Sequence, residues 1–184
     1  MIEAAAAVDD VMVNGPEDDL LDWQSIDCRA VEGEVRRSRQ RIFTATQAGD
    51  LKKVCNLQKL MLRSRANTLL SVRRVTEINA GRKTPGVDGR AVLLAQENAE
   101  LADWAQHCSS SWTPRAVKRA FIPKAGGKQR PLGIAVIADR VLQAWVVNAL
   151  EPEWEARFEP KSYNFRPGRA CQNAISAFYL TLKG

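Results

Sequence analysis

Apolar residues recur at helical spacing through the first part of the chain. In residues 23–48 they form an intermittent apolar face while arginines occupy much of the remaining surface, and this pattern predicts a helix. Gly49 then suits a helix C′ position and Asp50 an N-cap, so a second helix is predicted over residues 51–78. Two long helices joined by a tight turn form a helical hairpin.

A different pattern occupies residues 119–134, where two short strand-like runs flank an Ala-Gly-Gly turn. Glycines tolerate a positive φ, and the three segments together predict a β-hairpin. Pro123 and Pro131 each remove a backbone donor, so both strands are expected at or near a sheet edge.

Helical spacing returns in three further segments, at residues 91–107, 137–150 and 170–182. The middle helix is predicted to close at the Glu-Pro pair of residues 151–152, because proline disfavours helical backbone in the residue before it. The sequence therefore predicts a predominantly helical α+β protein, in which an N-terminal helical hairpin is followed by a short β-hairpin.

Charge is distributed unevenly along the chain. Residues 1–27 contain eight acidic and no basic residues, whereas the remainder contains 27 basic against 13 acidic residues, a net charge of +14 compared with +6 for the whole. We predict a flexible acidic tail over residues 1–21, followed by a strongly basic body. Such a body favours phosphate-rich partners, although net charge does not distinguish nucleic acid from an anionic membrane surface.

The predicted helix over residues 51–78 carries a row of cations. At about 100° per residue, four of them fall in one narrow stripe, and no acidic residue lies between Leu51 and Thr76. A charged helix face is usually only solvated, but a solvated face normally mixes signs, so this one favours phosphate contact. The four residues are Lys52, Lys59, Arg63 and Arg74.

Two basic loops rich in glycine and proline are predicted between the helices. The first, residues 81–89, contains Lys83 and lacks the residue order of a P-loop. The second, residues 161–169, mixes aromatic with basic side chains, which can stack on bases and pair with phosphates; the alternative is that the aromatics anchor the core. Its four notable residues are Tyr163, Phe165, Arg166 and Arg169.

Metal and membrane functions find little support in the sequence. The four cysteines are far apart without a C-x-x-C pair, and His107 is the only histidine, so neither a metal site nor a disulfide framework is predicted. No apolar run approaches the roughly 18–20 residues that span a bilayer, and the N-terminus lacks the order of a signal peptide. A cytoplasmic location without a membrane partner is therefore expected.

Three blocks of the sequence together resemble one family. They are residues 83–89 (Lys-Thr-Pro-Gly-Val-Asp-Gly), residues 122–143 (Ile-Pro-Lys, Gly-Lys, Arg-Pro-Leu-Gly-Ile, Asp-Arg and Gln, in that order) and residues 162–169 (Ser-Tyr, then Phe-Arg-Pro-Gly-Arg). In order and spacing they are similar to the N-terminal part of bacterial group II intron reverse transcriptases, the intron-encoded maturases. The resemblance extends from about Trp23 to the end of the chain.

The resemblance implies a reverse transcriptase N-terminal helical domain over residues 22–113 and a partial fingers subdomain of a right-hand polymerase over residues 114–184. It implies that Lys124 and Arg130 approach the triphosphate of the incoming nucleotide, the lysine as a mobile point charge and the arginine as a planar fork. It also implies that further basic residues bind template-primer or intron RNA, namely Lys83, Lys128, Arg166 and Arg169.

Two positions differ from the family pattern: Asn164 stands where glycine is usual, and Ala135-Val136 where Pro-Thr is common. The aspartate blocks that hold metal ions in the family are not found in the sequence. No catalytic or metal-binding residue is therefore predicted, and Mg²⁺ is expected only for a complete enzyme.

These considerations predict a truncated, split or fragmentary reading frame that binds RNA and does not polymerise alone. A separate chain that supplies the palm is one arrangement consistent with this prediction. The alternatives are a stand-alone RNA-binding splicing-accessory module and a degenerate remnant.

Overall fold

The computed structural model describes residues 21–163 and 166–183. The predicted acidic tail lies outside these residues except for Leu21, and so do Asn164 and Phe165. The described chain is mainly helical with one small antiparallel sheet, which confirms the α+β class. The elements are η1 (Trp23–Ser25), α1 (Cys28–Gln47), α2 (Leu51–Arg63), α3 (Arg65–Arg73), η2 (Arg74–Ile78), α4 (Ala95–His107), η3 (Ser109–Ser111), β1 (Lys118–Pro123), η4 (Ala125–Gly127), β2 (Gln129–Ile134), α5 (Ile137–Arg157) and α6 (Cys171–Lys183).

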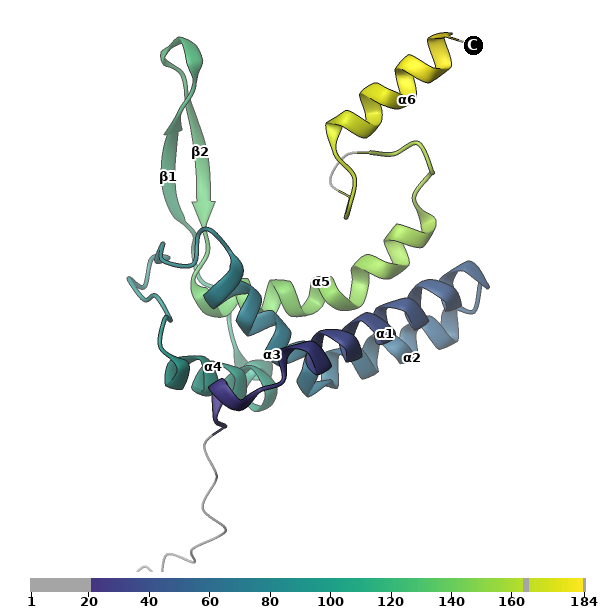
Figure 1. Ribbon diagram of the computed structural model, residues 1–184. Coiled ribbons are helices and arrows are strands. Elements are labelled where there is room, and N and C mark those ends of the chain that lie inside the picture. Colours follow the sequence, from purple (N-terminus) through teal and green to yellow (C-terminus); the bar gives the residue numbers. More distant parts are fainter. Residues whose placement is uncertain (1–20, 164–165, 184) are drawn as a thin grey trace, which may run out of the picture.

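Helices α1 and α2 form the predicted helical hairpin (Figure 1). Helix α1 starts later than residue 23, because the side chain of Asp27 caps it by accepting from two amides of its first turn at 3.0 and 3.1 Å. Gly49 takes a φ of 72° after α1, and Asp50 then caps α2 through the amide of Lys53 at 3.0 Å.

The single helix predicted over residues 51–78 is wrong, because the helix breaks at Ser64. The backbone of Ser64 is extended, with φ −73° and ψ 123°, and its hydroxyl oxygen accepts from the amide of Asn67 at 3.4 Å to cap α3. Residues 74–78 then wind as a π-helix. Positions before and after Ser64 therefore do not share one continuous helical face.

Helix α4 begins at Ala95, later than the predicted residue 91. The carboxylate of Glu97 accepts hydrogen bonds from the amides of Leu94 and Leu93, each at 3.0 Å, which satisfies donors at the start of the helix and keeps the preceding chain out of it. These hydrogen bonds lower the pKa of the Glu97 carboxyl.

Strands β1 and β2 form the predicted β-hairpin, which stands away from the helices in Figure 1. They pair antiparallel from Lys118 opposite Ile134 to Pro123 opposite Gln129. No third strand joins them within the described residues, so both strands lie at an edge, as the prolines predicted. At the tip, Gly126 takes the positive φ that the turn requires, 80°.

Helix α5 is 21 residues long and continues past the Glu-Pro pair where the sequence predicted its end. Pro152 has no N–H for the carbonyl of Asn148, four residues earlier. That carbonyl instead accepts from Nη1 of Arg39 in α1 at 3.5 Å, and the ring of Pro152 is buried. Contacts with α1 therefore allow helix α5 to continue past Pro152. Figure 1 shows α5 bent along its length.

Two hydrophobic clusters form the core of the described chain, and α5 belongs to both. One joins α1 and α2 to Ala149, and the other joins α3 and α4 to Ile137 and Val141. A buried polar contact also joins α3 to α5, where Asn148 Nδ2 donates to Asn67 Oδ1 at 2.8 Å. The packing is therefore continuous across the domain boundary predicted at residue 114.

Candidate nucleotide and nucleic-acid interface

The register of the β-hairpin gathers cations on one of its faces. Arg130 pairs with Ile122, and residues directly opposite in an antiparallel pair point to the same side. Lys124 follows Ile122 by two residues in extended backbone, and its amide donates to the carbonyl of Lys128 at 2.8 Å. Lys124, Lys128 and Arg130 therefore share a face, whereas Arg119 lies on the other.

These three cations are exposed, and none of them forms an ion pair with another described residue. Unpaired positive charge on a projecting hairpin attracts polyanions. The lysines offer mobile point charges, and Arg130 offers a planar fork that can donate to two phosphate oxygens at once. The hairpin therefore has the chemistry of a phosphate-binding finger.

Arg140, near the start of α5, ties the first basic loop to the base of the hairpin. Its guanidinium donates to the carbonyls of Gly81 at 3.1 Å and Thr84 at 2.7 Å, and its Nε donates to the carbonyl of Ala135 at 2.8 Å. Partial burial lowers the pKa of this arginine, which stays charged at neutral pH. Lys83 is exposed within the tethered loop and so lies on a fixed backbone.

The buried carboxylate of Asp139 holds the segment that leads into β1. It accepts from Trp112 Nε1 at 2.6 Å and from the amide of Arg115 at 3.1 Å. The Asp-Arg pair of residues 139–140 belongs to the second of the three sequence blocks that carry the family resemblance. No local pattern indicates its structural role, because every partner of the pair lies at least five residues away along the chain.

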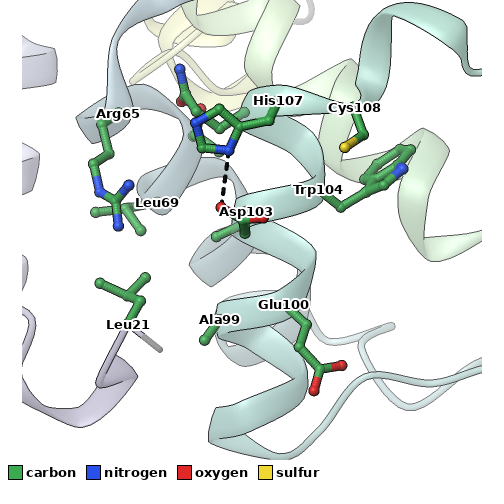
Figure 2. Close-up of a pocket in the computed structure, with 12 residues that line it drawn as sticks. Leu21, Arg65, Leu69, Ala99, Glu100, Asp103, Trp104, His107 and Cys108 are labelled. Atoms are coloured by element: carbon green, nitrogen blue, oxygen red, sulfur yellow. Dashed lines mark hydrogen bonds and ion pairs between the residues drawn. The ribbon is translucent and has the colours of Figure 1, made fainter. Parts of the chain in front are cut away.

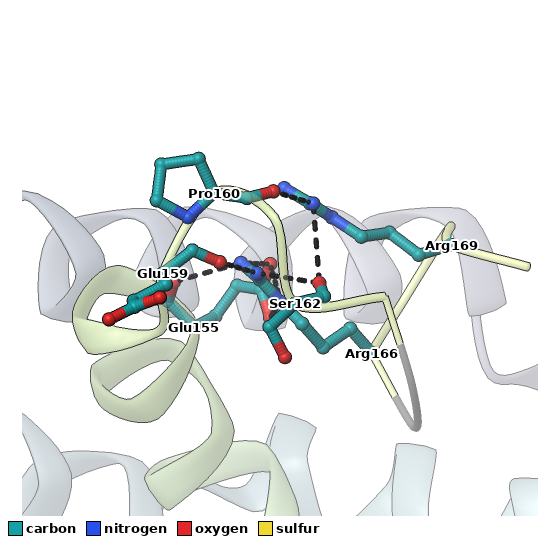
Figure 3. Close-up of polar contacts among 6 residues, drawn as sticks. All are labelled: Glu155, Glu159, Pro160, Ser162, Arg166 and Arg169. Atoms are coloured by element: carbon teal, nitrogen blue, oxygen red, sulfur yellow. Dashed lines mark hydrogen bonds and ion pairs between the residues drawn. The ribbon is translucent and has the colours of Figure 1, made fainter. Parts of the chain in front are cut away.

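Arg166 faces into the second basic loop rather than outward (Figure 3). Its side chain is only 5% exposed and donates to the Glu155 carboxylate at 2.6–3.1 Å and to the carbonyls of Glu159 and Ser162 at 2.8 and 3.0 Å. The hydrogen bonds between the two side chains lower the pKa of Glu155 and raise that of Arg166. A nucleic-acid phosphate would have to displace Glu155 to reach this guanidinium.

Arg169 also anchors the second loop, but less completely. Its Nη1 donates to the carbonyls of Pro160 and Ser162 (Figure 3). Its guanidinium lies 5.6 Å from the ring centre of Tyr163. It forms no ion pair with a described acidic residue, and it is half-buried. Arg169 therefore carries its positive charge beside an aromatic ring, with no described carboxylate at ion-pair distance.

The stripe of cations on the second predicted helix is divided by the break at Ser64. Lys52, Lys59 and Arg63 all lie in α2 with exposed side chains at the spacing of one helical face. Arg74 lies beyond the break, in η2. There it lines a groove that the three residues of α2 do not line. The structure therefore keeps three of the four predicted cations together.

Comparison with known proteins assigns the family. Residues 23–104, which extend from η1 to α4, match the N-terminal domain of reverse transcriptase. The chain is 31% identical over 144 residues to maturase-like protein 1 of Euglena gracilis, and 39% identical over 66 residues to the group II intron-encoded protein LtrA of Lactococcus lactis. This chain carries the N-terminal region of a group II intron reverse transcriptase/maturase.

Two of the relatives match most of this chain, and every match covers a smaller part of the relative. Protein YkfC of Escherichia coli is 38% identical over 130 residues, which are 68% of this chain and 34% of that protein. The Euglena gracilis match covers 78% of this chain and 31% of the relative, and the LtrA match covers 35% and 11%. The chain spans about a third of the length of the first two of these relatives.

A cavity of about 630 Å³ lies between α3 and α4 of this maturase region (Figure 2). His107 and Asp103 pair there across 2.9 Å, at the exposed end of α4. Residues 21–163 and 166–183 contain no group of three histidine, cysteine or acidic side chains close enough to hold a metal ion. Nor do their helices include one with the length and apolar character needed to cross a membrane.

Proposed function

We propose that this region binds RNA and, in a complete reverse transcriptase, presents a fingertip to the phosphates of the incoming deoxynucleotide. The observation that carries the proposal is the hairpin register, which puts Lys124, Lys128 and Arg130 on one exposed face. Lys124 and Arg130 would bind the triphosphate and offset the charge that develops on the leaving pyrophosphate. Lys128, which flanks the turn opposite Lys124, would contact nucleic acid.

The proposed RNA partner is a group II intron or a template-primer duplex. The names of the maturase and group II intron relatives support this partner, and so does the strong positive charge after residue 27. We assign phosphate contact to exposed or partly exposed basic residues and give Arg166 the role of positioning the second loop. The phosphate-binding residues are Lys52, Lys59, Arg63, Arg74, Lys83, Lys128 and Arg169.

We place the metal chemistry of such an enzyme outside the residues assigned here. A palm, in the same or in another chain, would hold Mg²⁺ on its carboxylates and supply the charge neutralisation that phosphoryl transfer requires. The fingers residues would bind and orient the triphosphate from the opposite side. We also propose a cytoplasmic location.

Binding of the purified chain to a group II intron transcript tests this proposal, measured by fluorescence anisotropy over a series of salt concentrations. If about six phosphates are contacted, the affinity is expected to fall about 10³-fold between about 50 and 200 mM salt. A transcript of equal length without the intron structure is the matched control for specificity. No binding at low salt, or an affinity that salt does not change, would overturn the proposal.

A further inference from the structure

A groove of about 550 Å³ lies where α1, α3 with η2, and α5 meet. Helix α1 contributes one face to it, because its four lining residues recur at helical spacing. The second wall comes from α3 and η2 and the third from α5, and two residues of the second basic loop complete the lining. The lining residues are Glu32, Val35, Arg36, Arg39, Leu70, Arg74, Asn148, Glu151, Arg166 and Pro167.

Each acidic side chain that lines this groove forms an ion pair with an arginine. Glu151 pairs with Arg39, and Glu32 pairs with Arg73 at 2.7 Å. Arg166 likewise pairs with Glu155. The ion pairs therefore account for every carboxylate that lines the groove and for two of its four arginines.

Arg36 and Arg74 are the two lining arginines that remain. Both are exposed, they lie on facing elements, and neither forms an ion pair or a side-chain hydrogen bond with another described residue. Two like charges that border one groove repel each other, and an anion bound between them relieves that repulsion. The lining thus contains four arginines and two glutamates, and both glutamates already have an ion-pair partner.

The apolar floor of the groove comes from Val35 and Leu70, of which only the half-buried Leu70 offers surface to a ligand. Val35 is 2% exposed and belongs to the core cluster of α1 and α2, and Leu70 packs against the same cluster. An apolar floor between two arginine forks suits a chain that alternates phosphates with sugars and flat bases. A compact inorganic anion would leave this floor unused.

We infer that this groove binds a phosphodiester segment of RNA, with Arg36 and Arg74 each donating to a phosphate while the sugar or base packs on Leu70. This inference rests on the proposed RNA-binding function and adds a site to it. The site is separate from the hairpin, because it is lined by α1, α3, η2 and α5 and by no residue of β1 or β2. Arg36, which the sequence pattern did not single out, becomes a binding residue.

The test compares the purified chain with its Arg36→Ala/Arg74→Ala variant in binding to a fluorescent oligouridylate of about 20 nucleotides. Loss of two phosphate contacts to a single strand should reduce the slope of log K against log salt concentration by about 1.4, and the affinity about 25-fold at about 0.1 M salt. The Arg36→Lys/Arg74→Lys variant keeps both charges and should retain most of the slope.

The matched control is Arg41→Ala/Lys53→Ala, which also removes two exposed and unpaired charges but lies outside the groove. It should keep the slope and most of the affinity, and circular dichroism should show all variants folded. If the original chain binds and Arg36→Ala/Arg74→Ala binds equally well, or no worse than the control variant, the groove is not a site. If the original chain itself does not bind, the proposed function fails along with the inference.

Discussion

Gly86 lies against the backbone of Val136, so closely that a Cβ placed on Gly86 would be 2.7 Å from the Val136 Cα. Gly86 belongs to the first basic loop, and Val136 is the residue that precedes α5. Only a residue without a side chain permits this approach. The glycine therefore lets the loop that carries Lys83 pack on the base of the β-hairpin.

Replacement of Gly86 by alanine is expected to lower the free energy of unfolding by about 1–3 kcal/mol, because the added methyl must push the loop away from backbone atoms that cannot yield. Urea unfolding followed by circular dichroism measures this change. Gly81→Ala is the matched control in the same loop, since a Cβ there meets nothing within 4 Å and the backbone needs no positive φ. Equal stabilities of the two variants would contradict the close packing.

Asp139→Ala is expected to destabilise the chain by about 3 kcal/mol. The substitution leaves the indole N–H of Trp112 and the amide of Arg115 without their acceptor, and an unsatisfied donor costs about 1–3 kcal/mol. Thermal unfolding measures the loss, and tryptophan fluorescence reports the release of Trp112. Asp103→Ala, which removes a side chain 69% exposed from its pair with His107, should change stability by no more than about 0.5 kcal/mol.

The ion pair of Glu155 and Arg166 makes the second loop sensitive to acid. Hydrogen bonds from Arg166 hold the pKa of Glu155 below its usual 4.5. A carboxyl with a lowered folded pKa contributes stability above the usual pKa, and that contribution is lost as the pH falls through the lower folded value.

The difference in stability between the original chain and Glu155→Gln should therefore be largest near neutral pH and should shrink below about pH 4.5. Urea unfolding at a series of pH values measures it. Glu100→Gln is the control, because Glu100 forms no ion pair with a described residue. A difference that stays constant from neutral to acidic pH would show that the ion pair does not hold the loop.

The two faces of the β-hairpin should differ in nucleotide binding. Arg130→Ala is expected to weaken the binding of a deoxynucleoside triphosphate at least about tenfold, because it removes charge-assisted hydrogen bonds. Arg119→Ala removes an arginine side chain from the opposite face of the hairpin and should have little effect on this binding. Titrations followed by NMR chemical shifts on the 184-residue chain compare the two variants. Equal losses would rule out a single binding face.

Local chemistry explains what the sequence could predict. The turn between α1 and α2 depends on Gly49 and Asp50, which act within a few residues of their own position. The β-hairpin likewise follows from a glycine turn, and strand alternation then puts Lys124 and Arg130 on one face. These features need no knowledge of distant parts of the chain.

Contacts between distant residues explain what the sequence could not predict. Helix α5 passes Pro152 because Arg39, more than a hundred positions earlier, donates to the freed carbonyl of Asn148. Arg166 points inward because it forms an ion pair with Glu155 on α5. A basic residue in a glycine-containing loop therefore holds the loop in place. The groove of Arg36 and Arg74 depends on the packing of three helices. No single stretch of sequence contains any of these relationships.

Helix α5 sets the spacing between the two basic loops. Arg140 near its start holds the first loop, and Glu155 near its end holds the second. Over its 21 residues the helix spans on the order of 30 Å. The distance between the two loops is therefore set by the number of helical residues between their anchors. One residue inserted between these anchors would turn the second loop about 100° around the helix axis. Loop lengths can therefore vary without consequence for this spacing, whereas the length of α5 cannot.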